Sequence, residues 1–425
     1  MRSKIINIMP FPPAYELFWN EPRPEISWNT PNGTWVGVWG KDWSELIGKE
    51  VLKSTNEFEY EVWQPDLRAD RIYTHTFTNG LVRKLFPAEL KKRIYGFKKN
   101  EYVVSRSLYS NLITENIGNK VMLHLNGINP GISRNVLSLT LNCPIVLQFF
   151  GKIILPLDNL IKFKKNVLSK VSDVFEHIVI RKLLNEVAFV AYCNGEDRVS
   201  LERYVNARTI VLPVGIDFDF WRRKSEKNSA RKRLGLRNTS FILLSSSRLN
   251  SLKQIDRMID VLRHFSNDFD FQYIVTGHGN HEYEEYLARL GESLIKKGKL
   301  KFVGFLPEDK LVDYYSAADL FVTTSLLEGG PISAVKAIAM EMPIFSTMTG
   351  MVAEFLSKYK AGVLVPATNY EVWEQSLKNI LTGSKIETID REWAESFFHW
   401  PNVARKYVQM YEELSANSSN NKEWN

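Results

Sequence analysis

Two basic side chains lie where a loop leaves a predicted buried strand. Arg248 and Lys253 stand within SSRLNSLK (246–253), directly after the apolar run 240–245. In a loop between a strand and a helix, a guanidinium fork and a compact ammonium group can neutralise a diphosphate. An ordinary basic loop would have the same composition, so this pair alone does not identify a ligand.

The stretch SLLEGGPISAVKAIAM (325–340) carries a second chemical signal. Glu328 and two glycines follow the predicted strand 320–324, and Pro331 suits the first position of a helix. The free amides of a helix start bind anions, and glycine lets the backbone approach a ligand closely. Glu328 could accept hydrogen bonds from sugar hydroxyls there, or it could simply stabilise the helix dipole.

The elements that must position these groups follow an alternating pattern. Buried strands are predicted at 4–9, 58–62, 121–125, 145–149, 187–192, 240–245, 271–276, 301–303, 320–324 and 343–346. Helical periodicity lies between them, at 43–51, 254–265, 283–297, 308–316 and 332–340. This predicts an α/β protein of two Rossmann-like doubly wound domains. Such sheets bind ligands at the carboxyl ends of their strands, so we expect the two domains to face a shared cleft.

Composition excludes several classes of protein. The 425 residues are 44% hydrophobic and 24% charged, which is typical of globular domains and not of disordered or coiled-coil chains. Two cysteines, Cys143 and Cys193, indicate a reducing compartment. No uncharged run reaches the roughly 20 apolar residues of a spanning helix, and early prolines end the first apolar run. We therefore expect a cytoplasmic protein.

The positive charge is concentrated in the first half. Residues 1–212 carry 28 Lys and Arg against 21 Asp and Glu, which accounts for the whole net charge of +7. The densest segment, 83–99, contains one acid, Glu89. It is a candidate for peripheral contact with an anionic membrane at the inner face of the plasma membrane, or else a solvated helix face. Nucleic-acid binding is disfavoured because no recognisable module accompanies this modest basicity.

An ordered series of motifs identifies a family. The series is VLPVGID (211–217), SSRLNSLK (246–253), TGHG (276–279), KFVGFLPEDKLVDYYSAADLFVTTSLLEGGP (301–331) and FFHWPNVARKYVQMYEEL (397–414). In this order it resembles the retaining nucleotide-sugar glycosyltransferases of family 4, which have the GT-B fold. The resemblance covers about 190–414 specifically and the first half only loosely.

The resemblance implies a role for each matching residue. Arg248 and Lys253 would neutralise the donor diphosphate and support the leaving group, and Glu328 would hold the transferred sugar. The implied donor-binding residues are Arg248, Lys253, Glu328, Gly329, Gly330, Pro331, Ile332 and Lys336. The implied reaction transfers a hexosyl group with retention from a UDP- or GDP-linked donor to a glycan or lipid-linked acceptor, in the synthesis of a cell-surface polysaccharide, lipopolysaccharide or glycolipid. It needs no cofactor and no metal.

The αβ pattern restarts after Pro213, which predicts a domain boundary near 212–216, and the resemblance implies the role of each domain. Residues 1–212 would form the acceptor-binding domain and 213–396 the nucleotide-sugar-binding domain. A C-terminal helix near 397–414 would return to the first domain, and the polar segment 415–425 is predicted to be a disordered tail.

Three positions depart from the family pattern. Lys336 replaces the second glutamate of a paired motif, which in the family holds the nucleotide ribose, and Glu341 replaces a glycine after the same helix. Phe150, in PIVLQFFGK, stands where many members carry a histidine near the transferred sugar. These departures keep two alternatives open: a catalytically inactive binding or regulatory protein, and another enzyme on the same fold, such as a sugar-nucleotide epimerase or a phosphorylase.

Candidates on the acceptor side are fewer. Gly33 is the only plausible match to the family's glycine-rich loop, and Phe150 and His124 are cleft candidates at strand ends. His124 is equally compatible with a hydrogen-bonded structural histidine. Five tryptophans, Trp19, Trp28, Trp35, Trp39 and Trp43, could stack on acceptor sugars, lie at a membrane interface or pack within their own loop.

Overall fold

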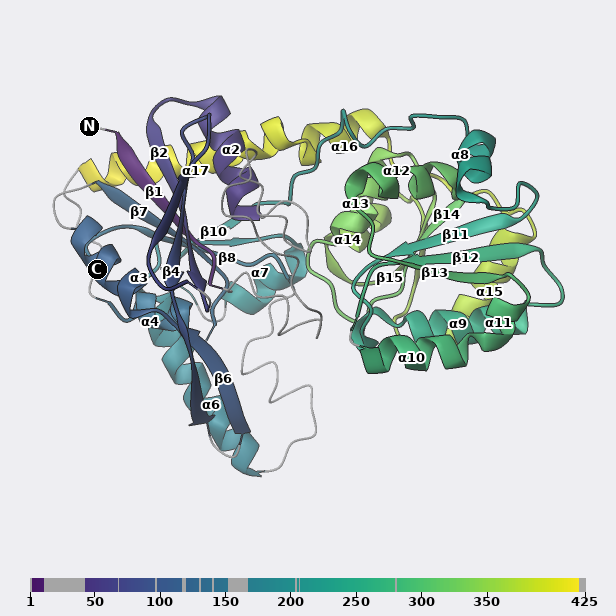
Figure 1. The fold of residues 1–425 in the computed structure, drawn as a ribbon, viewed down its shortest axis with the longest axis horizontal. Helices are drawn as coiled ribbons and strands as arrows, with labels where there is room; N and C mark the ends of the chain where they lie inside the picture. Colours follow the sequence, from purple (N-terminus) through teal and green to yellow (C-terminus); the bar gives the residue numbers. More distant parts are fainter. Residues whose placement is uncertain are drawn as a thin grey trace. The chain divides into compact units, whose positions relative to one another are not determined.

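The computed structural model describes most of the chain. The described residues are 2–10, 43–67, 69–95, 98–116, 120–129, 131–139, 141–151, 167–202, 205, 207–279 and 281–419. The described residues divide into two compact units, one formed by those up to Pro213 with the segment from Pro401 onwards, the other by Val214–Trp400 (Figure 1). The division lies one residue after the predicted end of the first domain at Leu212.

The first unit contains an eight-stranded sheet in the order β10-β9-β8-β7-β1-β2-β4-β3. The strands are β1 (Ser3–Ile8), β2 (Phe58–Asp66), β3 (Tyr73–Thr76), β4 (Val82–Pro87), β7 (Val121–Asn126), β8 (Ile145–Gln148), β9 (Phe189–Tyr192) and β10 (Arg208–Val211). Every neighbouring pair is parallel except β3 with β4. Such a sheet needs helices on both faces, because its strands are apolar on both sides.

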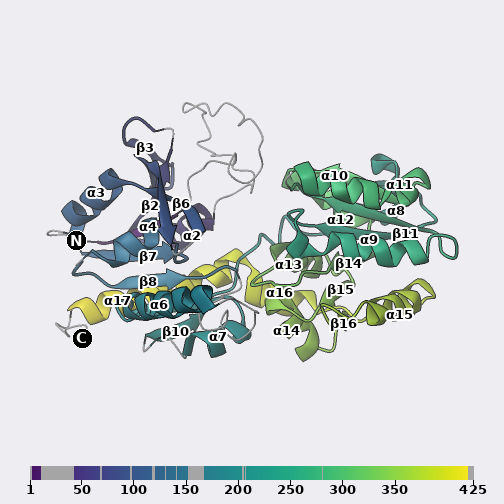
Figure 2. The same ribbon diagram turned by 90° about the horizontal axis from the view of Figure 1, so that it is seen from below.

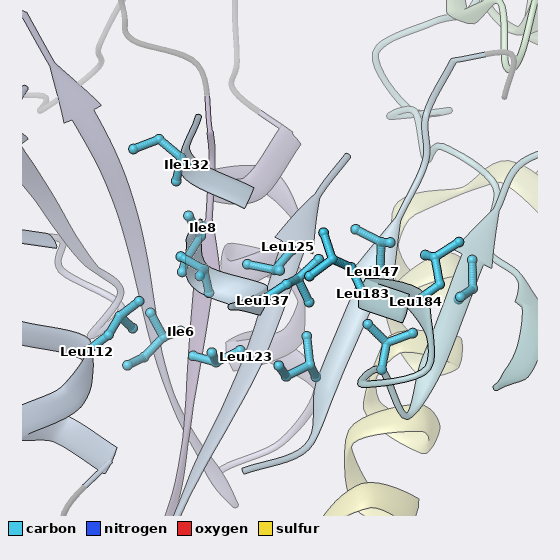
Figure 3. Close-up of a cluster of buried hydrophobic side chains, with 14 of the residues drawn as sticks. Ile6, Ile8, Leu112, Leu123, Leu125, Ile132, Leu137, Leu147, Leu183 and Leu184 are labelled. Atoms are coloured by element: carbon cyan, nitrogen blue, oxygen red, sulfur yellow. The ribbon is translucent and has the colours of Figure 1, made fainter. Parts of the chain in front are cut away.

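Alternate residues of the central strands point to the two faces of this sheet. Ile6, Leu123 and Leu147 face a cluster of buried side chains that includes Leu112 and Leu184 (Figure 3). The helices of this unit are α2 (Trp43–Ser54), α3 (Arg106–Asn116), α4 (Ile132–Leu137), α6 (Val167–Leu184), α7 (Gly195–Glu202) and the return helix α17 (Trp400–Ser419). The core cluster draws on α3, α4, α6 and α7.

The second unit contains a six-stranded parallel sheet in the order β13-β12-β11-β14-β15-β16, of which Figure 2 labels β11, β14, β15 and β16 in succession. Its strands are β11 (Phe241–Ser246), β12 (Phe271–Thr276), β13 (Leu300–Gly304), β14 (Leu320–Thr323), β15 (Ile344–Thr347) and β16 (Val363–Val365). Its helices are α8 (Lys227–Leu234), α9 (Ile255–His264), α10 (His281–Leu290), α11 (Glu292–Lys296), α12 (Glu308–Ala317), α13 (Ile332–Ala339), α14 (Gly350–Lys358), α15 (Tyr370–Leu381) and α16 (Arg391–Phe398). The strand order reverses between β11 and β14, so the topological switch point lies there.

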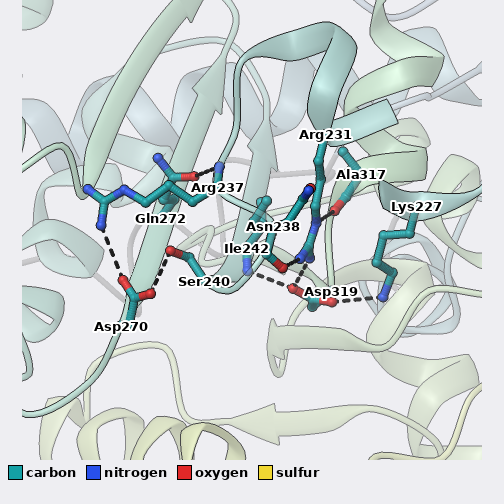
Figure 4. Close-up of polar contacts among 10 residues, drawn as sticks. All are labelled: Lys227, Arg231, Arg237, Asn238, Ser240, Ile242, Asp270, Gln272, Ala317 and Asp319. Atoms are coloured by element: carbon teal, nitrogen blue, oxygen red, sulfur yellow. Dashed lines mark hydrogen bonds and ion pairs between the residues drawn. The ribbon is translucent and has the colours of Figure 1, made fainter. Parts of the chain in front are cut away.

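Acidic side chains anchor the amino ends of these strands. Asp319, just before β14, accepts from Lys227 Nζ at 2.7 Å and from the backbone amide of Ile242 at 2.7 Å (Figure 4). Asp270, just before β12, accepts from Ser240 Oγ at 2.9 Å. Both carboxylates at this edge therefore have partners within the protein. The loops that carry Arg248, Lys253 and Glu328 lie at the opposite edge of the sheet.

Three predictions about local structure were wrong. The helix predicted at 283–297 is two helices, α10 and α11, which break at Gly291, where an added Cβ would lie 2.3 Å from Leu300 Cδ2. Helix α17 extends beyond 414 to Ser419, and the Ser415 hydroxyl lies 3.0 Å from that of Ser3. Residues 415–419 are therefore helical and do not belong to a disordered tail, and 420–425 lie outside the described residues.

The third correction concerns the basic segment 83–99. It forms β4 and the antiparallel hairpin of β5 (Glu89–Tyr95) and β6 (Lys98–Val104), and not a helix. Arg83 is buried and its Nη1 lies 3.0 Å from Glu45 Oε2, while Lys84 Nζ lies 2.8 Å from Glu61 Oε2. The first two cations of the segment are therefore internal partners of carboxylates and do not form part of a basic surface.

Candidate functional site

Four loops meet at the carboxyl edge of the second unit's sheet. They are residues 247–254 after β11, 277–279 after β12, 324–331 after β14 and 348–349 after β15. Leu326 N donates to Leu252 O at 2.7 Å, Leu249 N to His278 O at 2.8 Å and Met351 N to Gly329 O at 2.8 Å. These backbone bonds join the loops on both sides of the switch point.

Glu328 and Lys253 contact each other across the switch point. Lys253 Nζ pairs with Glu328 Oε1, and Ser325 Oγ donates to the same oxygen at 2.7 Å. The Glu328 side chain is 13% exposed and that of Lys253 is 21% exposed. The carboxylate is therefore oriented by two donors and remains partly accessible.

The Arg248 guanidinium belongs to the same electrostatic environment. Arg248 is exposed at the surface, yet nearby protein atoms partly desolvate its guanidinium and so lower its pKa. The negative charge of Glu328 opposes that shift. An arginine with a lowered pKa still carries its charge at neutral pH. Arg248, Lys253 and Glu328 therefore share one electrostatic environment at the carboxyl edge.

The backbone that carries Lys253 is held at several points. Lys253 ends the short 3₁₀ helix Ser251–Lys253, and the Asn250 side chain accepts from Leu252 N at 3.1 Å. Thr324 Oγ1 donates to Lys253 O at 2.9 Å, which ties this loop to the end of β14. Gln254 follows with a positive φ of 50°. These contacts place Lys253 beside the Glu328 turn.

The turn from Gly329 to Ile332 leads into α13. Gly329 and Pro331 are buried, Gly330 and Ile332 are half-buried, and Pro331 O accepts from Ala334 N at 3.0 Å. The first amides of an α-helix have no partner within the helix, so the α13 start adds positive potential next to Glu328. Together with Arg248 and Lys253, this start can bind a phosphorylated ligand.

The segment after β15 fixes the Glu328 turn from the other side. Glu328 N donates to Thr349 Oγ1 at 3.2 Å. Gly350 has a φ of 75°, and an added Cβ would lie 2.7 Å from Glu328 Cβ. Ser325, Thr349 and Gly350 were not among the residues predicted from sequence. Only the position of Ser325, three residues before Glu328, could have suggested a contact.

Lys336 contacts two protein side chains. Its Nζ lies 2.8 Å from Glu308 Oε1 and 4.4 Å from the centroid of the Trp221 ring. At the end of the same helix, Glu341 adopts a left-handed φ of 53°, while Met342 N donates to Ala337 O at 3.0 Å. The helix therefore keeps the left-handed termination that a glycine usually provides.

The acceptor-side candidates lie in the first unit or outside the described residues. Gly33 and four of the five tryptophans are outside the described residues, and Trp43 begins α2. Phe150 is half-buried just after β8. His124 is fully buried: its Nδ1 lies 2.5 Å from Tyr411 Oη and its Nε2 lies 2.8 Å from Gln148 Oε1. His124 thus links β7, β8 and α17 in the interior.

The buried His124 predicts an acid-sensitive first unit. Burial lowers its pKa to about 4, while an unfolded histidine titrates near 6.5. Between these values only the unfolded chain takes up the proton, so stability falls as the pH decreases from 6.5 to 4, by about 3 kcal/mol. Urea unfolding at pH 7 and pH 4.5 should show a smaller acid loss in His124→Gln than in the wild type. His281→Gln, at an exposed histidine, should behave as the wild type, and equal pH slopes in all three proteins would contradict the assignment.

No helix in the described part of the chain is long and apolar enough to cross a membrane. Among the same residues, no group of three or more His, Cys, Asp or Glu could hold a metal ion.

Comparisons with known proteins show which proteins this chain is similar to in sequence and in fold. Residues 226–394 match the family model of glycosyl transferases group 1. An uncharacterized glycosyltransferase of Methanocaldococcus jannaschii is 24% identical over 241 residues, which are 55% of this chain and 59% of that protein. The chain matches about half the length of the curated relatives.

Solved structures show the same fold. Sucrose-phosphate synthase from Thermosynechococcus elongatus superposes with a TM-score of 0.70 at 17% identity, over 98% of this chain and 100% of that one. Anabaena HepE in complex with UDP gives 0.65 at 13% identity, over 97% and 100%. The fold is the α/β GT-B fold, and the chain resembles the family-4 glycosyltransferases.

Proposed function

We propose that this protein is a retaining glycosyltransferase that moves a hexosyl group from a UDP- or GDP-linked donor to a glycan or lipid-linked acceptor. The match of residues 226–394 to glycosyl transferases group 1 supports the class of reaction. The retaining outcome, and catalysis without a cofactor or a metal ion, come from the resemblance to family 4.

The contact between Lys253 and Glu328 carries this proposal. It places a cation and a carboxylate at the switch point of a doubly wound sheet, next to the start of α13. A diphosphate bound there would attract Lys253 and Arg248, which leaves the Glu328 carboxylate to accept hydrogen bonds from sugar hydroxyls. The same cations and the α13 amides would stabilise the negative charge that develops on the leaving group.

The proposed setting is the synthesis of a cell-surface polysaccharide, lipopolysaccharide or glycolipid, at the cytoplasmic side of the membrane. Residues 1–212 would bind the acceptor and 213–396 the donor. Membrane contact would involve the exposed part of the 83–99 segment, such as the half-buried Lys91 and the exposed Lys92, because Arg83 and Lys84 are paired internally.

Nucleotide binding can be tested by thermal unfolding with UDP, GDP, ADP, CMP and their sugar conjugates. A ligand at 100 times its dissociation constant should add about 2.7 kcal/mol to stability, which corresponds to a shift of several degrees. We expect one nucleotide class to give this shift, and we expect Lys253→Ala to abolish most of it. Lys296→Ala, at an exposed lysine of the same unit, is the matched control. A wild-type protein that no nucleotide stabilises would contradict the proposal.

The alternative is a binding or regulatory protein without turnover. The lysine at position 336 favours it, because an ammonium group cannot accept hydrogen bonds from a ribose as the family's glutamate does. Binding of a sugar nucleotide without sugar transfer or donor turnover would support this alternative. Donor conversion without any acceptor would instead indicate an epimerase or another enzyme on the same fold.

A further inference from the structure

The loop between β13 and α12 presents an aromatic ring and a carboxylate at the carboxyl edge of the second unit's sheet. Phe305 directly follows β13, and it is 43% exposed, although phenylalanine is usually buried. Glu308 is the first residue of α12, and its side chain is 42% exposed. Only Leu306 and Pro307 lie between the two residues in the chain.

Lys336 holds Glu308 from the neighbouring helix. The ion pair is 2.8 Å long, and the Lys336 side chain is only 14% exposed because it also packs over the Trp221 ring. Lys336 lies one helical turn after Ile332 on α13, on the same helix face. The pair therefore fixes an exposed carboxylate close to the helix whose start carries the Glu328 turn.

We infer that Phe305 and Glu308 form the nucleoside half of the donor site. Glu308 accepts hydrogen bonds from the ribose hydroxyls, and Phe305 stacks on the base. Carboxylates bind ribose hydroxyls in this way at the carboxyl edges of doubly wound sheets, and aromatic rings stack on bases of any identity. The inference rests on the proposed function, since it assigns one end of the same donor.

This assignment gives Lys336 a positioning role. A lysine side chain has hydrogen-bond donors but no acceptor, so Lys336 cannot itself accept hydrogen bonds from the ribose hydroxyls. Its partner Glu308, on α12, supplies the acceptor. Lys336, on α13, orients the Glu308 carboxylate.

Asp309 supplies the matched control for Glu308. Both acids lie in the first turn of α12, so both stabilise the helix dipole. Asp309 is exposed, and none of the described ion pairs joins it to Lys336. A dipole effect would make the two positions equivalent, whereas ribose binding distinguishes them.

The test measures dissociation constants of UDP, GDP and their 2′-deoxy forms for the full chain. We expect the wild type to prefer the ribonucleotide by about tenfold, as for one charge-assisted hydrogen bond. Glu308→Gln should remove most of this preference, and Asp309→Asn should keep it. Lys336→Met should reduce the preference and Lys336→Arg should restore it, while Phe305→Leu should weaken both forms of the nucleotide equally.

The outcomes separate this inference from the proposed function. If UDP or GDP binds but Glu308→Gln keeps the wild-type preference for ribose, the inference is overturned and the donor site stands. If neither nucleotide binds the wild type, the proposed function fails, and this inference fails with it.

Discussion

Glu328→Gln is expected to lower the rate of sugar transfer by two to three orders of magnitude. The amide keeps the shape of the side chain but loses the charge that binds Lys253 and would accept hydrogen bonds from the transferred sugar. Loss of one preorganised electrostatic partner at a reacting group costs about 10²–10³ in kcat. The measurement is kcat and KM for the sugar nucleotide that stabilises the wild type, by release of free nucleotide.

A matched surface variant makes this result specific. Glu292 pairs with Lys296 at a distance of 2.6 Å, but both side chains are mostly exposed on α11. Glu292→Gln should therefore leave kcat and KM unchanged. Wild-type turnover by Glu328→Gln would exclude a role in transfer, and measurable donor binding without turnover in the wild type would favour the non-catalytic alternative.

The position of the site could be predicted because its residues follow strands of one parallel sheet. Lys253 comes after β11 and Glu328 after β14, and neighbouring parallel strands end at the same edge. That β11 and β14 are neighbours, although β12 and β13 lie between them in the chain, is known only from the structure. The contact between the two loops follows from this topology and from local features such as the Asn250 turn.

Contacts between distant segments could not be predicted in the same way. Lys336 carries a charge that suggests a ligand, but its partners, Glu308 and Trp221, are fixed by how α12 and α13 pack. Arg83 appears in sequence as part of a basic surface, yet strand alternation turns it inward to Glu45. A charged residue's environment depends on its facing partners, which periodicity does not specify.

His124 shows the same limit in the first unit. Its place near the end of a strand suggested a cleft, but Tyr407 and Tyr411 of α17 cover that face of the sheet. These tyrosines lie more than 280 residues later in the chain, so only the fold brings them to His124.

Gly350→Ala is expected to damage the Glu328 turn more than its conformational cost alone explains. The residue has a φ of 75°, and an added Cβ would lie 2.7 Å from Glu328 Cβ and 2.9 Å from Gly329 O. Backbone atoms are involved, so the overlap cannot be relieved by rotating a side chain. We expect a loss of about 1–3 kcal/mol from overpacking, in addition to about 1 kcal/mol for the left-handed alanine.

Gly383→Ala isolates the second of these costs. Gly383 has a φ of 100° and no atom within 4 Å of an added Cβ, so alanine there pays the conformational cost without displacing a neighbour. Unfolding free energies should therefore fall further in Gly350→Ala than in Gly383→Ala, and only Gly350→Ala should lose kcat. Equal stability and equal activity of the two variants would show that the segment after β15 does not position Glu328. A loss of kcat in Gly350→Ala with the nucleotide-induced thermal shift retained would show instead that the carboxylate has moved while the phosphate-binding loop has kept its place.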